Sequence, residues 1–184
     1  GTLLGAVASA DGSTLAVWGT TGLFVIRNGN VTHTIGIAAA AVSISADGML
    51  LAATSNGIDK MAKNLQVFAI GDRWHMLWSY HAMEVVRNPE FSTNGTLLAF
   101  GTDIGQVYVA DVQSGAIVWE DDLGSSCSFT FLPDGALVAA SWMGRVAVYE
   151  PLTYATRWSV VVQSTSTDLP TTFLRPDPTP KTFQ

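Results

Sequence analysis

Ser92-Thr93-Asn94-Gly95-Thr96-Leu97-Leu98-Ala99-Phe100 is the stretch that decides the fold, because a tight polar turn leads at once into a short apolar strand. Asn-Gly and Asp-Gly between apolar runs are strong signals of a β-hairpin, since both central residues of the favoured two-residue turn need positive φ. The signal occurs four times in the chain, and the residue directly before the glycine is Asp11, Asp47, Asn94 or Asp134. The sequence therefore predicts four hairpins of one repeated type.

Each predicted hairpin continues into two more strand-like segments, so one repeat holds four short strands in about 40 residues. Trp78, Trp119 and Trp158 fall at one equivalent place in the fourth strand of their repeats, and Ile35 falls there in the first repeat. No segment shows a sustained period of about 3.6 residues, which a helical repeat would need. The chain is therefore expected to be all-β and built from four-stranded units.

The segment from Gly105 to Trp119 resembles a repeat of the WD-repeat and quinoprotein-like β-propellers. Its Gly-x-Val-x-Val strand and the Ser-x-Asp-Gly turns are similar to the first group, and the in-register tryptophans are similar to the docking tryptophans of the second. The likeness spans about Leu3 to Val162, with Ala110-Asp111 and Tyr149-Glu150 where the first group has Trp-Asp. The resemblance implies a β-propeller of four-stranded antiparallel blades, with about four repeats here that belong to a larger ring of about six to eight blades.

The chain is interpreted as two parts. Residues 1–168 form four blade repeats, and residues 169–184 are the start of a fifth repeat or a proline-rich terminal segment. The fifth repeat is supported by Phe173-Leu174-Arg175-Pro176-Asp177, which echoes Phe131-Leu132-Pro133-Asp134. Three closely spaced prolines after it are typical of extended chain.

Four blades are fewer than a full ring of this kind, so the apolar faces of the end blades need a cover. Three alternatives are open: a fragment of a longer chain, a ring completed by a second copy or another protein, and a closed four-bladed ring. The open faces are expected around Leu15, Val17 and Val25 in the first blade and around Val138, Val146 and Val148 in the last.

Composition excludes several classes of partner. Fifteen acidic residues stand against nine basic ones, with no run of Lys or Arg, which argues against binding to nucleic acid. No stretch is long and apolar enough for a membrane span. The sequons at Asn30 and Asn94 are candidate glycosylation sites, and with only three lysines they favour an extracellular or cell-envelope protein, although the compartment stays open.

No catalytic, cofactor-binding or metal-binding residue is predicted. His33, His75 and His81 fall on different strands or loops, and the single cysteine, Cys127, cannot build a multi-thiolate site. The Asp and Asn residues of the repeated turns are assigned structural roles, because short acceptors satisfy backbone donors there. Structural roles are assigned to Asp11, Asp47, Asn94, Asp134, Trp78, Trp119 and Trp158.

Partner-binding candidates lie in turns, where packing demands less of a large side chain. Trp74 and Trp142 are exposed-aromatic candidates. The long second repeat carries an insertion with Asp59, Lys60 and Lys63, and Asp103 lies in the corresponding turn of the third repeat. Insertions in repeat proteins often mark the binding face.

These features favour a non-enzymatic propeller segment that acts as a protein-interaction or assembly scaffold, with protein as the partner: additional blades, a second copy or another subunit. Two alternatives remain. The chain could be part of a quinoprotein-like or hydrolytic propeller enzyme whose active residues lie in absent blades. It could also be a structural subunit of an extracellular polymer in which open blade edges pair.

Overall fold

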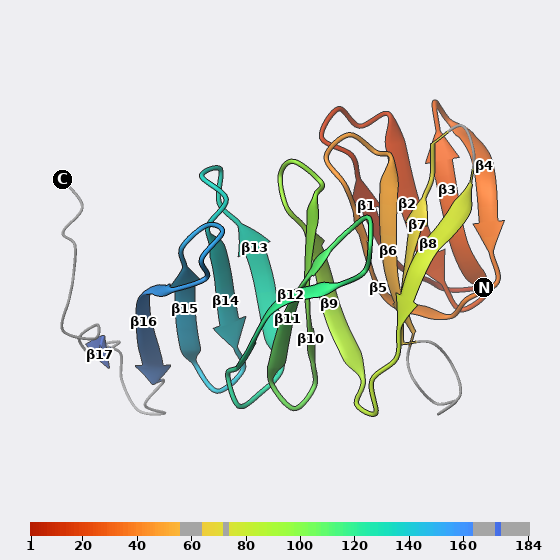
Figure 1. Ribbon diagram of the computed structural model, residues 1–184. Coiled ribbons are helices and arrows are strands. Elements are labelled where there is room, and N and C mark those ends of the chain that lie inside the picture. The colour runs from red at the N-terminus through yellow and green to blue at the C-terminus, as the bar shows by residue number, and fades with distance from the viewer. Residues whose placement is uncertain (56–63, 72–73, 164–171, 174–184) are drawn as a thin grey trace.

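The computed structural model describes residues 1–55, 64–71, 74–163 and 172–173, and the regular elements of these residues are all β-strands. The strands form four antiparallel sheets that follow one another along the chain (Figure 1). We call these sheets the first to the fourth blade.

The first two blades have strand orders that follow the chain from inner to outer strand. The first blade contains β1 (Leu3–Ala8), β2 (Thr14–Gly19), β3 (Gly22–Arg27) and β4 (Asn30–Ile35). The second contains β5 (Ala39–Ile44), β6 (Leu50–Ser55), β7 (Leu65–Ala69) and β8 (His75–Tyr80).

The last two blades repeat this order. The third contains β9 (Val86–Phe91), β10 (Leu97–Thr102), β11 (Gln106–Asp111) and β12 (Ile117–Asp122). The fourth contains β13 (Cys127–Phe131), β14 (Leu137–Ser141), β15 (Arg145–Tyr149) and β16 (Thr156–Gln163), and the short β17 (Thr172–Phe173) pairs with β16. Apart from β17, the proposed fifth repeat in 169–184 lies outside the described residues.

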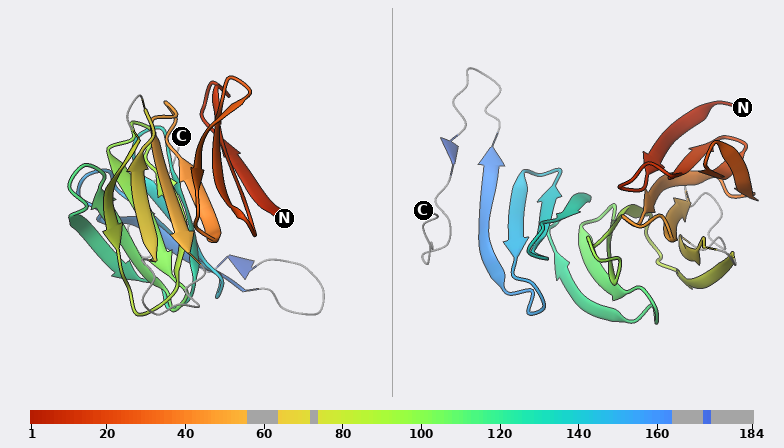
Figure 2. Two further views of the ribbon diagram at one scale, coloured as in Figure 1. Left: turned by 90° about the vertical axis from the view of Figure 1, so that its right-hand side faces the viewer. Right: turned by 90° about the horizontal axis from the view of Figure 1, so that it is seen from above.

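The blades stack side by side through their inner strands. Strand β5 contacts β1 and β9, and β9 also contacts β13. Seen from above, the blades follow an arc with the first and fourth blades at its two ends (Figure 2). The predicted all-β fold of four-stranded propeller blades is therefore confirmed, whereas membership of a larger ring stays a prediction.

The four repeated turns share two hydrogen bonds, and all four differ from the predicted two-residue turn. In each, the glycine N–H donates to the carbonyl three residues earlier, and an Asp or Asn Oδ1 accepts the backbone N–H two residues further on. Only the glycines, Gly12, Gly48, Gly95 and Gly135, have positive φ. Each turn holds more residues than predicted: Ser9 bonds to Thr14, Ser45 to Leu50 and Ser92 to Leu97 across four residues, whereas Leu132 bonds to Ala136 across three.

Backbone register corrects one detail of the repeat alignment. The residue opposite the central valine of the third strand is Trp78, Trp119 or Trp158 in the last three blades, and it is His33 in the first, not Ile35. The cause is the Asn28-Gly29 turn, whose φ values of 49° and 79° fit a tight two-residue connection between β3 and β4. The corresponding turns of the other blades are longer, so the tryptophan lies two positions further along the sequence.

The core consists of three clusters, and each fills the seam between two neighbouring blades. Ala16 and Val25 of the first blade pack in the cluster that holds Leu51 and Phe68 of the second. Val25 is fully buried there, so it faces the second blade. Its predicted place on the open face of the first blade is therefore wrong. Because side chains alternate along a strand, its neighbours Phe24 and Ile26 point to the opposite face.

Candidate interaction surfaces

One pair of positions recurs at every seam, with one partner from each blade. We call the residue opposite the third-strand valine the docking residue. We call the residue that meets it from the next blade the receiving residue. In each blade, the receiving residue stands two positions before the fourth-strand residue that pairs with the position after the third-strand valine. Those fourth-strand residues are Val31, Met76, Ile117 and Thr156. From the first to the fourth blade, the docking residues are His33, Trp78, Trp119 and Trp158, and the receiving residues are Gly29, Trp74, Gly115 and Tyr154.

The first seam pairs the smallest docking residue with the largest receiving one. The rings of His33 and Trp74 stack with their centroids 4.9 Å apart, and Trp74 also stacks on Phe68 at 4.8 Å. Trp74 is half-buried against the core of this seam. Its role inside the seam was not apparent from the sequence, because its partner His33 comes from the preceding blade.

The second seam reverses the sizes. The Nε1–H of Trp78 donates to the carbonyl of Val112 at 2.7 Å. Gly115 has a φ of 73°, and a Cβ there would lie 2.8 Å from Cγ of Trp78. A side chain at the receiving position would therefore collide with the indole, so this seam requires glycine opposite its tryptophan.

The third seam stacks two aromatic rings. The centroids of Trp119 and Tyr154 lie 5.0 Å apart with an angle of 18° between their planes, and Tyr149 meets the same indole at 4.5 Å. Tyr154 has a φ of 52°, close to the values of Gly29 and Gly115. This shared left-handed conformation supports the equivalence of the three receiving positions.

The fourth docking residue, Trp158, has no receiving residue among the described blades. It is half-buried and lines a cavity of about 520 Å³ on the outer face of the fourth blade. Val138 and Val148, which sit where Ala52 and Val67 sit in the second blade, lie in the same cavity wall. The remaining lining residues are Leu132, Pro133, Asp134 and Arg157. Arg157 is held in place by Asp134 at 3.0 Å and Glu150 at 2.9 Å.

A second surface runs along the side of the arc where the blade-to-blade connections lie, the lower side in Figure 1. We call it the rim and define it as Met83–Val85, Asp103–Gly105, Leu123–Ser126 and Trp142–Met143. Backbone bonds join these loops in a row: Asp103 N–H donates to the Val85 carbonyl, Leu123 to Gly105, and Trp142 to Ser126. The rim is therefore one continuous strip across the third and fourth blades.

The rim exposes large apolar side chains. Met83 is 97% exposed, Trp142 is 86% exposed, and Ile104 and Met143 are also exposed. Trp142 and Asp103 were predicted as partner-binding residues, and both lie on this strip. Met83, Ile104 and Met143 were missed, because a single apolar residue in a turn gives no periodic signal. Their position between the second and third strands, or between blades, could have identified them.

Carboxylates outnumber cations at the rim and at the strand ends beside it. Glu84, Asp103, Asp121 and Asp122 lie there with Arg87 and Arg145. The Tyr149 hydroxyl donates to Asp121 Oδ2 at 2.6 Å, and burial together with this bond raises the pKa of Tyr149. Below the rim, burial raises the pKa of the Cys127 thiol to about 11. The strip is thus apolar with an acidic border.

The other predicted residues fall in different places. Asp59, Lys60 and Lys63 lie outside the described residues, so their binding role stays a prediction. Asn30 and Asn94 are both exposed, and the use of either sequon stays a prediction. Asn94 Oδ1 accepts the Ser92 hydroxyl and the Thr96 N–H. Asp11 makes the same bonds with Ser9 and Ser13, which lower its pKa to about 2.

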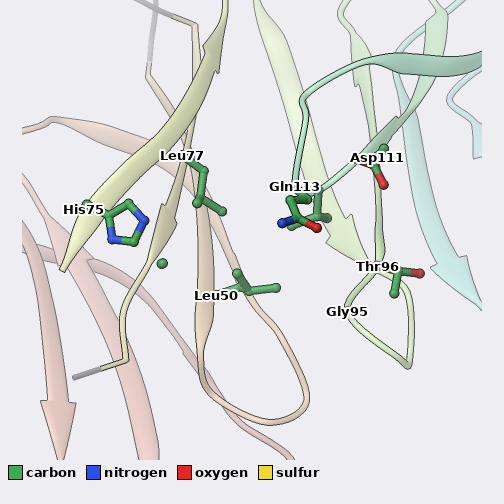
Figure 3. Close-up of a pocket in the computed structure, with 9 residues that line it drawn as sticks. Leu50, His75, Leu77, Gly95, Thr96, Asp111 and Gln113 are labelled. Atoms are coloured by element: carbon green, nitrogen blue, oxygen red, sulfur yellow. The ribbon is translucent and has the colours of Figure 1, made fainter. Parts of the chain in front are cut away.

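A smaller cavity of about 340 Å³ lies between the second and third blades (Figure 3). Gly95 and Thr96, in the turn between β9 and β10, line it, so it lies at the strand ends opposite the rim. Leu50 and Leu77 form one wall, and His75 lies at its border (Figure 3). The carboxylate of Asp111 accepts bonds from the N–H and hydroxyl of Ser114, which lower its pKa. Asp111 therefore serves the turn between β11 and β12.

Two searches for other kinds of site bear on the described residues. These residues include no group of three or more His, Cys, Asp and Glu side chains placed to hold a metal ion. They also include no helix with the length and hydropathy needed to cross a membrane.

Comparison with known proteins places the fold but no family. No protein-family model matches the chain, and no curated protein matches it. Among solved structures, the chain is similar to one in the "Crystal Structure of Mitotic Checkpoint Complex", with a TM-score of 0.73 and 14% identity. The match covers 86% of this chain and 51% of that one, so this chain spans about half of its length. The likeness shows a propeller fold, and the choice between WD-repeat and quinoprotein-like families stays a prediction.

Proposed function

We propose that the chain is a non-enzymatic scaffold for protein interaction, and that the rim is its binding surface. The observation that carries the proposal is the strip of exposed apolar side chains, Met83, Ile104, Trp142 and Met143, on loops joined by backbone hydrogen bonds. Single exposed apolar residues are common, but contiguous ones mark interaction sites, and tryptophan is enriched in them.

The partner is a protein segment that carries apolar side chains next to Lys or Arg. Apolar side chains of the partner cover Trp142 and Met143, and its cations meet the carboxylates of Glu84, Asp103 and Asp122. Complementary charge of this kind speeds association and selects among partners. The structural neighbour belongs to a protein complex by its title, which supports a role in assembly by analogy of fold.

The proposal is tested by selecting peptides from a random displayed library on the immobilised chain. We expect selected peptides to combine aromatic or aliphatic residues with Lys or Arg. Trp142→Ala should weaken their binding about tenfold or more, because a central tryptophan commonly carries at least that much binding energy.

Leu152→Ala is the matched control, since Leu152 is 90% exposed in the turn between β15 and β16, on the side away from the rim. It should leave peptide binding unchanged. Selection of acidic peptides, or equal binding to wild type and Trp142→Ala, would contradict the assignment of the rim.

A further inference from the structure

The two ends of the arc carry the two halves of a seam that the described blades do not complete. The forward half is the outer face of the fourth blade, with the docking residue Trp158 above Val138 and Val148. In the three internal seams the equivalent docking residue is covered by the next blade: His33 by Trp74, Trp119 by Tyr154, and Trp78 by the backbone at Val112.

The backward half is the outer face of the first blade. Leu15 pairs with Ile26 in the same register as Leu51 with Phe68, Leu98 with Ala110 and Leu137 with Tyr149. Leu51, Leu98 and Leu137 are completely buried against the preceding blade, whereas Leu15 is 36% exposed. The first blade therefore presents the usual backward face, and none of the other described blades lies against it.

The receiving position of the first blade fits a tryptophan. It is Gly29, which has a φ of 79° and no atom within 4 Å of the place where a Cβ would stand. Gly115 has nearly the same φ, and its corresponding space is filled by the indole of Trp78. The open space at Gly29 is thus the space that Trp78 occupies in the second seam, and Trp158 is the docking tryptophan that has no receiving residue among the described blades.

We propose that Trp158 of one chain docks at Gly29 and Leu15 of a second copy, so that the fourth blade of one chain and the first blade of the other form a further seam, head to tail. The two faces are different surfaces, and such contacts build closed rings or open filaments, depending on whether the rotation closes. This inference concerns the ends of the arc and is independent of the function proposed for the rim.

The test uses sedimentation velocity on two variants of the full chain. Trp158→Arg removes the forward half and keeps the backward half, and Leu15→Arg does the reverse. We expect each variant alone to sediment as a monomer of 19.5 kDa, with pairing weakened about a hundredfold or more, because a buried charge replaces a central contact. An equimolar mixture should form one-to-one pairs, since one intact half of each kind is present.

Two controls keep the result interpretable. Circular dichroism and thermal unfolding confirm that both variants fold, as expected for residues outside the internal seams, and Gly29→Asn repeats the backward-face test with a residue that tolerates the left-handed backbone. Trp142→Arg on the rim should associate as the wild type does.

Two results would overturn the proposal. One is a mixture of the two arginine variants that stays monomeric while the wild type associates, which would mean that the association does not join an intact forward half to an intact backward half. The other is a wild-type chain that stays monomeric at about 100 μM, a concentration at which interfaces of even modest affinity form.

Discussion

Trp119 and Trp158 occupy one register position in neighbouring blades, and within the described residues a following blade covers Trp119 but not Trp158. Truncating each to alanine therefore measures what the seam contributes, with residue type, strand and register held constant. The expected result is a large loss of stability for Trp119→Ala and a small one for Trp158→Ala.

The magnitude follows from the contacts. Trp119 stacks on Tyr154 and meets Tyr149, and it packs against the core of the third seam. Trp119 is half-buried, so we expect its truncation to cost about 3 kcal/mol, the lower end of the range for a fully buried tryptophan, with about 0.5–1.5 kcal/mol from each aromatic pair. Among the described residues, Trp158 lines a cavity with side chains of its own blade, so we expect its truncation to cost about 1–2 kcal/mol.

Urea unfolding followed by far-ultraviolet circular dichroism is the assay, because removing a tryptophan alters the fluorescence signal itself. With a slope of about 2 kcal/mol per molar urea, the midpoint should fall by about 1.5 M for Trp119→Ala and by less than about 1 M for Trp158→Ala. Dilute protein is used, so that pairing between chains does not stabilise the wild type. Equal shifts for the two variants, or a larger shift for Trp158→Ala, would refute the reasoning.

Three further predictions concern titratable groups. Because hydrogen bonds lower the pKa of Asp11 to about 2, the ionised carboxylate stabilises the fold above its unfolded pKa near 4, and this stabilisation is lost as pH falls toward 2. Asp11→Ala should therefore flatten that part of a plot of thermal midpoint against pH. Asp11→Asn should keep the turn, as Asn94 does in the third blade. Because the pKa of Tyr149 is raised, stability should fall as pH rises above about 10, where the unfolded tyrosine ionises, and the fall should be smaller in Tyr149→Phe. Cys127 is buried with a pKa of about 11, so a thiol reagent at about pH 8 should label it only after unfolding, and rapid labelling of the folded chain would show that the third seam opens.

The blades were predictable because their signals are local. Four consecutive residues, such as Ser45 to Gly48, predict each hairpin, and the strands that follow are short and apolar. Local signals failed where turn length changed. The Asn28-Gly29 turn is tighter than its counterparts, so counting along the sequence pointed to Ile35 where register selects His33.

Contacts between blades could not be predicted in the same way. Trp74 looked like an exposed turn residue, but its partner His33 lies in the preceding blade. The complementary sizes at the seams, such as Trp78 against Gly115, become visible only when register aligns two turns of different length. The exposure of Trp142 could be predicted from the sequence of its own turn, because that exposure does not depend on a contact with another blade.

Sedimentation equilibrium of the wild-type chain over a range of about 1–100 μM tests most directly the central claim, that the two ends of the arc are complementary halves of one seam. The account predicts a weight-average mass that begins near 19.5 kDa and rises with concentration. A mass that stays at 19.5 kDa over the whole range would contradict it.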